Sequence, residues 1–262
     1  MKKDEGLQDK IHSWLETQGY TTEMKVAMSL RHSGLDVLQS YYYDDPEMKT
    51  SREIDVICRL TDKIGLLEIY SVIECKKSQK PWILFTSEFA GSNRVTSFAV
   101  TSETNRKAIA SNIQDMIQID WLRKDGRIAY SITEAFTTKE DMAFKAGVGA
   151  TKAAIALSQS KSFSGPGLNF FFPTVVFEGQ LFECYPDKNG NAVISEINSS
   201  FLNFQIRFGD YQGASIHIVR LEALNKYCQE LNETFSQLKK HLKQERRKYA
   251  IQLNINPDSV ED

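Results

Sequence analysis

The sequence predicts an α/β or α+β domain in which helices pack against a mixed β-sheet, and three observations indicate this fold class. Short runs rich in β-branched and aromatic residues occur at residues 35–43, 53–58 and 67–75, which is typical of strands. Apolar residues recur at helical spacing near both ends of the chain. Helical and strand patterns follow one another along the chain, so a single sheet flanked by helices accounts for both.

The first helix and the three strands after it are delimited by turn-forming residues. The helix is predicted by apolar residues at positions i, i+4, i+7 and i+8, which are Leu7, Ile11, Trp14 and Leu15. Gly19 ends it, and Asp44-Asp45-Pro46 stops the first strand. Residues 61–65 form a turn, so the second and third strands are expected to pair as a hairpin.

The rest of the chain adds further helices and strands. We expect helices at residues 109–122 and, because of its many alanines, at 147–160. An apolar strand or hairpin with a turn at Glu178-Gly179 spans 170–184, and a short strand spans 215–219. No linker is evident. The predicted organisation is one domain over 1–262, with a core at 5–85 and 147–184, an elaboration at 86–146, and a C-terminal strand and long helix at 215–249.

Composition excludes several classes of protein. The chain has 262 residues, enough to bury a large core without disulfides or metals. Its net charge of −2 excludes a protein whose whole surface is basic, although it is compatible with a local basic patch. No run of about 18 apolar residues and no signal peptide are present, so we expect a cytoplasmic protein with no membrane contact. The cysteines, Cys58, Cys75, Cys184 and Cys228, form no C-x-x-C pair and are expected to be reduced thiols.

Charged residues interrupt the apolar strands of the predicted hairpin. If this hairpin is symmetric about Ile64 and Gly65, Asp55 lies opposite Glu74 on one face of the sheet. Directly opposed residues have Cβ atoms roughly 4.5–5.5 Å apart, and Lys76 shares the face two positions further on. Charges in such strands are costly unless they are compensated, and a catalytic site is one reason to carry them.

A divalent cation would relieve the repulsion between two facing carboxylates. Mg²⁺ binds through one or two carboxylates and keeps several water molecules, so two acids suit it. Such an ion can polarise a phosphodiester and neutralise charge on the leaving oxygen. A lysine beside it can orient or deprotonate the attacking water and stabilise the transition state. The alternative is a structural ion pair of Glu74 with Lys76 or Lys77 at the rim of a sheet.

Asp55 and, nineteen positions on, Glu74-Cys75-Lys76 resemble the D…(D/E)-x-K motif of the PD-(D/E)XK, or restriction-endonuclease-like, nucleases. The strings Arg-Glu-Ile-Asp-Val and Ile-Glu-Cys-Lys-Lys-Ser are similar to those of the restriction-enzyme-like branches, whose core is a helix, a hairpin, a helix and a strand. The resemblance is specific over 7–85 and looser to about 184. There a helix at 148–160 and a strand at 173–177 would complete the restriction-endonuclease-like core.

The resemblance implies a role for each residue of the motif. Asp55 and Glu74 would bind Mg²⁺, for which Mn²⁺ can substitute. The backbone carbonyl of Cys75 would be a further metal ligand, and Lys76 would be the catalytic lysine.

Other positions depart from the family pattern or add to it. Many relatives carry another acid on the first helix, where this chain has Gln8 and Asp9. Glu53 shares a face with Asp55 and is a further auxiliary candidate. Ile54 occupies the position of the proline in the family's name.

By this resemblance the protein is a Mg²⁺-dependent endodeoxyribonuclease of bacterial defence, restriction or repair, with DNA as its substrate. Partner proteins of a defence system are implied as well. The alternatives are a catalytically inactive nucleic-acid-binding or protein-interaction module on the same fold, and an RNase. No module that recognises the 2′-hydroxyl is visible, so the sequence does not decide between DNA and RNA.

Side chains outside the motif are candidates for nucleic-acid contacts. They are Lys77, Lys80, Trp82 and Lys152, and the run Lys239, Lys240, Lys243, Arg246 and Arg247. The simpler interpretations are a solvated turn or helix face and a buried tryptophan. Tyr41-Tyr42-Tyr43 is a candidate for base stacking, although alternation along a strand places at least one of these rings in the core.

The long C-terminal helix carries a narrow apolar stripe. Its residues recur at alternating spacings of three and four, and they are Leu221, Leu224, Cys228, Leu231, Phe235, Leu238 and Leu242. Such a stripe suits a coiled-coil seam, so we expect a homodimer. The alternative is that the stripe packs in a groove of its own domain.

Overall fold

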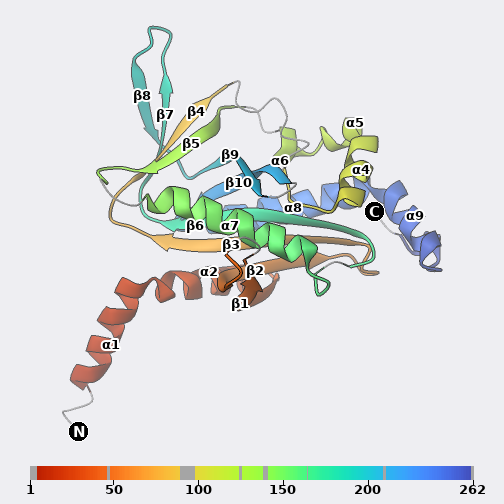
Figure 1. Cartoon of the computed structure of the whole chain (residues 1–262), viewed down its shortest axis with the longest axis horizontal. Coiled ribbons are helices and arrows are strands. Elements are labelled where there is room, and N and C mark those ends of the chain that lie inside the picture. The colour runs from red at the N-terminus through yellow and green to blue at the C-terminus, as the bar shows by residue number, and fades with distance from the viewer. Residues whose placement is uncertain are drawn as a thin grey trace.

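The computed structural model describes residues 5–45, 48–88, 98–123, 126–137, 141–163, 165–208 and 211–260. Within these residues the architecture is mixed α/β, with one large mixed sheet flanked by helices on both faces (Figure 1). The strands are β1 (Asp36–Asp44), β2 (Ser51–Thr61), β3 (Leu67–Lys77), β4 (Trp82–Ser87), β5 (Ile128–Glu134), β6 (Leu168–Glu178), β7 (Leu181–Pro186), β8 (Ala192–Glu196), β9 (Ser199–Phe208) and β10 (Tyr211–Arg220). The α-helices are α1 (Glu5–Gln18), α2 (Tyr20–His32), α4 (Glu103–Ser111), α5 (Ile113–Met116), α6 (Asp120–Arg123), α7 (Met142–Gln159), α8 (Leu224–His241) and α9 (Lys243–Gln252). The sheet order is β1-β2-β3-β6-β10-β9-β5-β4-β7-β8.

The hairpin of β2 and β3 has the register that the sequence predicts. Val56 pairs with Ile73 and Ile57 with Val72, as a hairpin symmetric about residues 64 and 65 requires. β1 continues the antiparallel arrangement on one side, and β6 lies parallel to β3 on the other. A parallel neighbour needs a crossover connection, and α7 lies in it. β6 is buried along almost its whole length, as expected for a strand covered on both faces.

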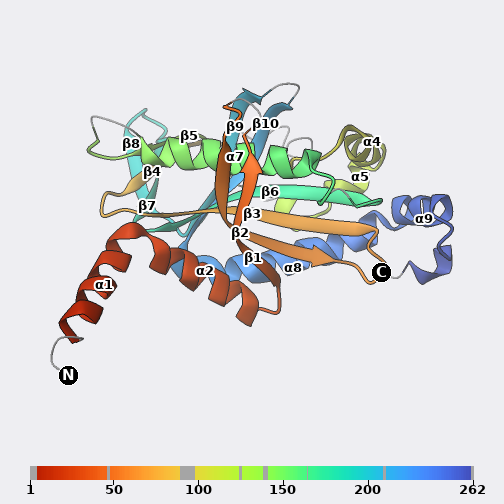
Figure 2. The ribbon, with the colours of Figure 1, turned by 60° about the horizontal axis from the view of Figure 1, so that its bottom comes forward.

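α7 packs on one face of the sheet, and α2 and α8 pack on the other (Figure 2). α7 begins at Met142 because the Asp141 carboxylate caps it, accepting hydrogen bonds from the backbone N–H groups of Ala143 and Phe144. The predicted helix thus exists and starts one turn earlier than its alanine content indicates. Small residues such as Ala150 are buried in it, so its backbone lies close to the strands.

The outer half of the β1–β2 hairpin bends across α7 (Figure 2). The bend lies at Ser40, which has a φ of 54° and is level with Asp55 on β2. Before the bend, Val37 packs on the side of α2 and α8. Beyond it, Tyr41 and Ile54 pack with residues of α7. Asp55 therefore lies where the two strands change direction.

The helices near the N-terminus and in the middle differ from the sequence prediction. α2 is absent from that prediction because only a few apolar residues, Val26, Ala27 and Leu30, face the core. Residues 109–122 contain the end of α4 followed by α5 and α6, rather than one helix. The interruption lies at Asn112, whose side-chain amide donates to the carbonyl of Ala108. A polar side chain that bonds to its own backbone favours such a break.

The segment 170–184 is not a hairpin. β6 pairs with β3 and β10, whereas β7 pairs with β4 and β8. A Cβ at Gly179 would lie 2.7 Å from the carbonyl oxygen of Ser78 and 2.4 Å from the ring of Phe177. The absence of a side chain at Gly179 therefore lets the chain pass close to Ser78, just after the end of β3, before β7 pairs with β4 and β8.

The apolar stripe near the C-terminus is buried in its own chain, and the interpretation as a dimer seam is wrong. Leu231 and Leu238 are fully buried in a core that also contains residues of α2, β2 and β6. The alternative, packing within the domain, is the one observed. The helix also breaks at Leu242, where α9 begins. No described helix is long and apolar enough to cross a membrane.

Candidate active site

The hairpin brings the residues of the predicted motif together at one end of β3. The Asp55 carboxylate accepts a hydrogen bond of 2.7 Å from the backbone N–H of Cys75. The Lys76 ammonium lies 2.6 Å from Glu74 Oε1 and donates to the Cys75 carbonyl at 3.2 Å. The two acids, the lysine and the carbonyl therefore form one cluster, which follows from the register of the strands.

α7 borders this cluster through a glycine. A Cβ at Gly149 would lie 3.5 Å from Glu74 Oε2, so the helix backbone passes directly beside the carboxylate. The side chains of Glu74 and Lys76 keep 21% and 25% of their surface exposed. The cluster is thus confined by the helix on one side and still partly open to solvent.

The carboxylates perturb one another because they share a partly buried space. Burial, and then the neighbouring charge of Glu74, raise the pKa of Asp55 to about 7. Burial opposes the charge on Lys76, but the carboxylates of Glu74 and Asp55 outweigh it and raise the pKa of Lys76. Once Asp55 is ionised, the cluster therefore carries more negative than positive charge, and Lys76 holds its proton.

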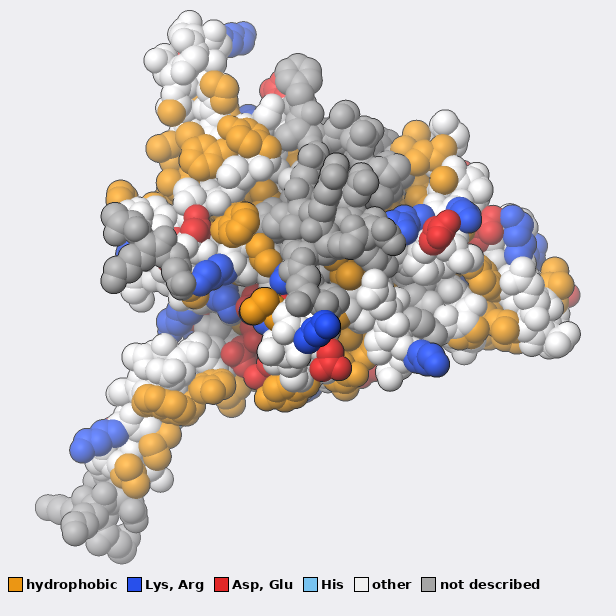
Figure 3. Space-filling view, in the orientation of Figure 1, with side chains coloured by type: hydrophobic (Ala, Val, Ile, Leu, Met, Phe, Trp, Pro, Cys, Tyr) orange, Lys and Arg blue, Asp and Glu red, His pale blue; other side chains and the backbone are white. Residues whose placement is uncertain are grey.

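A further acid, Glu23, belongs to this neighbourhood and is missing from the sequence prediction. It lies in the first turn of α2, and its pKa is raised by burial and then by the charges of Glu53 and Glu74. The resemblance pointed to an acid on the first helix, whereas this acid lies on the second helix, which the sequence pattern did not indicate. Figure 3 shows acidic side chains gathered beside α2 and the β1–β2 hairpin.

The auxiliary positions predicted on the first helix are not near the cluster. Gln8 and Asp9 are exposed on α1, which projects away from the sheet (Figure 1). Glu53 is exposed on β2, accepts a hydrogen bond of 3.5 Å from the Tyr42 hydroxyl, and is an electrostatic neighbour of Glu23. Of the three auxiliary candidates, the structure brings only Glu53 into the neighbourhood of the site.

The donor atoms of the cluster suit a hard cation. The Lys76 ammonium already contacts Glu74 Oε1 and the Cys75 carbonyl, two oxygens of the predicted ligand set. In the part of the chain that the structure describes, no three His, Cys, Asp or Glu side chains are grouped to hold an ion. A metal here would be held by two carboxylates, one carbonyl and water, which is the mode that Mg²⁺ favours.

Three of the predicted nucleic-acid contacts are wrong because their side chains are buried. Trp82 is fully buried and stacks on Phe177 with ring centroids 4.0 Å apart. Lys152 is buried and pairs with Asp45 at 3.5 Å. Arg246 is buried in an ion pair that belongs to another part of the fold.

The other cations lie at or near the surface. Lys77 pairs with Glu16 at 2.9 Å and with Glu178 at 3.6 Å, and Lys80 is exposed. The remaining members of the basic run, Lys239, Lys240, Lys243 and Arg247, lie at the end of α8 and in α9, at the end of the molecule opposite to α2 (Figure 2). The run is therefore separated from the acidic cluster.

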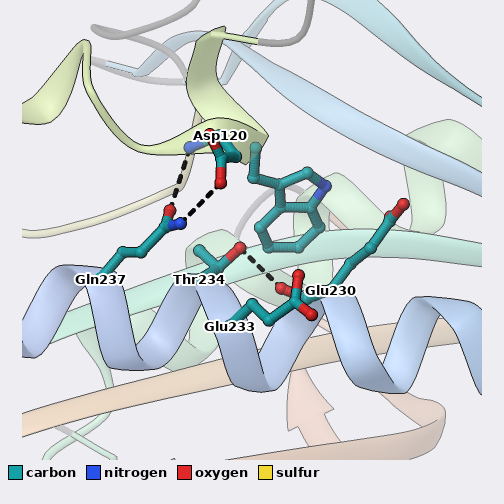
Figure 4. A pocket seen from close by; sticks show the side chains of 6 residues that line it. Asp120, Glu230, Glu233, Thr234 and Gln237 are labelled. Atoms are coloured by element: carbon teal, nitrogen blue, oxygen red, sulfur yellow. Dashed lines mark hydrogen bonds between the residues drawn. The ribbon is translucent and has the colours of Figure 1, made fainter.

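A cavity of about 190 Å³ lies between α6 and α8 (Figure 4). Asp120 and Gln237 join the two helices there, because the Gln237 amide donates to the Asp120 carboxylate at 2.7 Å and accepts from its backbone N–H at 3.0 Å. Glu230 and Glu233 also line the cavity. None of the residues of the acidic cluster lines this cavity.

Comparison with protein-family models, with curated proteins and with solved structures found no match to this chain.

Proposed function

We propose that the protein is a metal-dependent nuclease that hydrolyses phosphodiester bonds of DNA. One observation carries the proposal: the Asp55 and Glu74 carboxylates, the Cys75 carbonyl and Lys76 meet in a partly exposed cluster with an excess of negative charge. The sequence motif predicts these four groups as a set. The succession of α2, the three strands β1 to β3, α7 and the parallel strand β6 also agrees with the restriction-endonuclease-like core that the motif implies.

The residues of the chain divide the chemistry between them. A Mg²⁺ ion held by Asp55, Glu74 and the Cys75 carbonyl would polarise the phosphodiester and neutralise charge on the leaving oxygen. The neighbouring carboxylates raise the pKa of Lys76, so in the metal-free protein Lys76 carries a positive charge and hydrogen-bond donors that could stabilise the transition state. The Cys75 N–H fixes one oxygen of Asp55, which limits the positions of this carboxylate.

The biological setting of the proposal rests on the family resemblance. That resemblance supports DNA as the substrate and a role in bacterial defence, restriction or repair, with partner proteins of such a system. The geometry of the cluster suits any phosphodiester, so RNA is the alternative substrate. A binding module without activity is the alternative function, and Lys76 in its ion pair with Glu74 is the observation in its favour.

The test is incubation with plasmid, linear duplex DNA, single-stranded DNA and RNA, with Mg²⁺ and with EDTA. We expect cleavage with Mg²⁺ only. Asp55→Asn, Glu74→Gln and Lys76→Met should each reduce the rate by about 100-fold or more. Asp36→Asn, an exposed acid of the same three strands, is the matched control and should cut like the wild type.

Two results would contradict the proposal. One is a set of site variants that are as active as Asp36→Asn, and the other is cleavage that persists in EDTA. Circular dichroism of each variant separates loss of chemistry from loss of fold. If all three site variants unfold, the cluster is a structural ion pair.

A further inference from the structure

A cavity of about 300 Å³ lies between the bent part of the β1–β2 hairpin and the C-terminal end of α7. Tyr41, Tyr43 and Asp44 are among the residues that line it from β1, and Ala156 and Ser160 are among those that line it from α7. None of the groups assigned to the candidate active site lines this cavity, and the proposed reaction does not use it.

The cavity and the acidic cluster lie along the same side of α7. Gly149 borders Glu74, and Ala156 and Ser160 follow seven and eleven positions later, spacings that repeat on one helix face. At 1.5 Å per residue they lie about 10 to 16 Å from Gly149 along the helix axis. This separation corresponds to roughly three to five nucleotides of a stacked strand at 3.4 Å each.

The walls of the cavity are held in place by other contacts. The Asp45–Lys152 ion pair ties the hairpin to α7 between the cavity and the cluster. The ring of Phe163 meets that of Tyr41 nearly perpendicularly, with centroids 5.1 Å apart and planes at 85°. Tyr41 is thus a half-buried aromatic ring in a fixed orientation, which lowers the entropy cost of stacking on it.

The polar groups of the cavity determine which chemical groups of a ligand it can bind. Asp44 carries a negative charge, and the last turn of α7 presents backbone carbonyls with partial negative charge. Burial raises the pKa of Tyr43 to about 12, so its hydroxyl stays protonated and neutral. This environment repels a phosphate group and accepts hydrogen bonds from amino groups. A planar ring that bears an amino group fits both the aromatic wall and these acceptors.

We infer that this cavity binds a base of a single-stranded segment of nucleic acid while the acidic cluster holds the phosphate to be cut. The inference rests on the proposed function and names its substrate class, a strand with an unpaired nucleotide roughly three to five positions from the cleavage point. A base inside a duplex is paired and stacked, so it must leave the helix before it can enter a cavity.

The experiment measures binding of a fluorescently labelled oligo(dA) of twelve nucleotides, in EDTA so that cleavage plays no part. Tyr41→Leu keeps an apolar side chain against Phe163 but removes the ring. It should raise Kd by about 5- to 100-fold, the effect of losing one base–aromatic stack. Tyr41→Phe should bind like the wild type. Tyr130→Leu is the matched control, because Tyr130 is a 59% exposed tyrosine on β5.

A second variant covers the case in which Tyr41→Leu does not fold. Ala156→Leu fills the cavity from α7 and should weaken binding in the same way. The inference is wrong if either variant, when folded, binds the oligonucleotide as tightly as Tyr130→Leu does. It is also wrong if dAMP binds as tightly as the oligonucleotide, since the cavity would then be a site for free nucleotides.

Failure of the proposed function would look different from failure of this inference. A wild type that never cuts with Mg²⁺, but whose binding still depends on Tyr41, keeps the cavity as a single-strand site in a protein without nuclease activity. If the wild type cuts but its binding of the oligonucleotide does not depend on Tyr41, the cavity is not a base-binding site and the proposed nuclease activity stands.

Discussion

The two ends of the β2–β3 hairpin differ in how their buried charges are balanced. At the turn, Asp62 pairs with Arg246 of α9 at 2.7 Å, and both side chains are almost completely buried. The second oxygen of Asp62 accepts a hydrogen bond of 2.8 Å from the backbone N–H of Leu66. One acid thus meets one base, and the remaining acceptor is satisfied by the backbone. This end of the hairpin is balanced and closed.

At the other end, seven residues or about 23 Å along the strand, the charges do not balance. Asp55 and Glu74 share a single lysine, Lys76, and Glu23 and Glu53 add further negative charge nearby. The side chains stay partly exposed. The comparison indicates that the balanced pair holds the fold together, whereas the unbalanced cluster is the one for which we propose that it binds a cation.

The largest expected effect on stability belongs to the balanced end. Asp62→Ala removes the carboxylate of a buried ion pair, which costs about 3–5 kcal/mol. In a chain of this size we expect Tm to fall by roughly 10 °C, measured by differential scanning calorimetry. Replacing both residues, Asp62→Leu with Arg246→Met, should recover most of the loss.

Activity separates the two ends. The Asp62 variant should still cut nucleic acid below its lowered Tm, because the pair lies far from the acidic cluster. A variant with unchanged stability would show that this pair does not hold α9 to the hairpin. Loss of activity in the folded variant would show that the two ends are not independent.

The next effect concerns the pH dependence of stability at the unbalanced end. The pKa of Asp55 is raised from 3.8 to about 7, so the folded protein keeps a proton that the unfolded chain releases. This contribution to stability is complete below pH 4 and is lost as the pH rises through 7. In EDTA, Asp55→Asn should therefore be more stable than the wild type at pH 8, by on the order of 1 to 4 kcal/mol.

Urea unfolding at pH 4.5 and pH 8 measures this difference, with Asp36→Asn as the control. The gain from Asp55→Asn should be present at pH 8 and should shrink toward pH 4.5, where the wild type is itself protonated. A gain that is equal at both pH values, or a loss at pH 8, would mean that Asp55 is not strained by its neighbours.

The smallest effect is expected from the exposed lysines near the balanced end. Each lost phosphate contact would reduce the slope of log K against log salt by roughly 0.9. Arg246 stabilises the fold through its ion pair with Asp62, and the basic run of α8 and α9 lies far from the acidic cluster (Figure 2). Lys240, at the end of α8, and Lys248, in α9, are both exposed. Lys240→Ala with Lys248→Ala should thus change the slope of log K against log salt for DNA binding by less than roughly 0.9, the value for one phosphate contact. A fall of twice this value would establish α8 and α9 as a nucleic-acid surface.

The sequence is a good guide to the unbalanced end because local rules determine it. The turn after Thr61 and the alternation of the two strands set the register, which pairs Val56 with Ile73, and the next residues, Asp55 and Glu74, are close enough to interact electrostatically. An alanine-rich segment also predicts the helix that becomes α7, and an apolar run predicts a strand where β6 lies, although the parallel pairing of β6 with β3 is not among these predictions. These features depend on neighbours in the chain.

Other features depend on partners distant in sequence and could not be derived in the same way. In the sequence, Arg246 is one more cation of a charged run. Only the structure shows that α9 places it against Asp62. For Trp82 the sequence leaves a nucleic-acid contact and a buried ring as alternatives, and the stacking on Phe177 decides for the buried ring. Glu23 is an ordinary helix acid until α2 packs beside the hairpin, because burial there, and then the charges of Glu53 on β2 and Glu74 on β3, raise its pKa.

Calorimetric titration of Mg²⁺ and Mn²⁺ into the metal-free protein tests directly whether the unbalanced cluster is a cation site. We predict saturable binding by the wild type and by Asp36→Asn, and a large loss of affinity in Asp55→Asn and in Glu74→Gln, all at a pH where the variants are folded. A wild type that binds neither metal, or site variants that bind as well as Asp36→Asn, would contradict the assignment of this end of the hairpin as a metal-dependent active site.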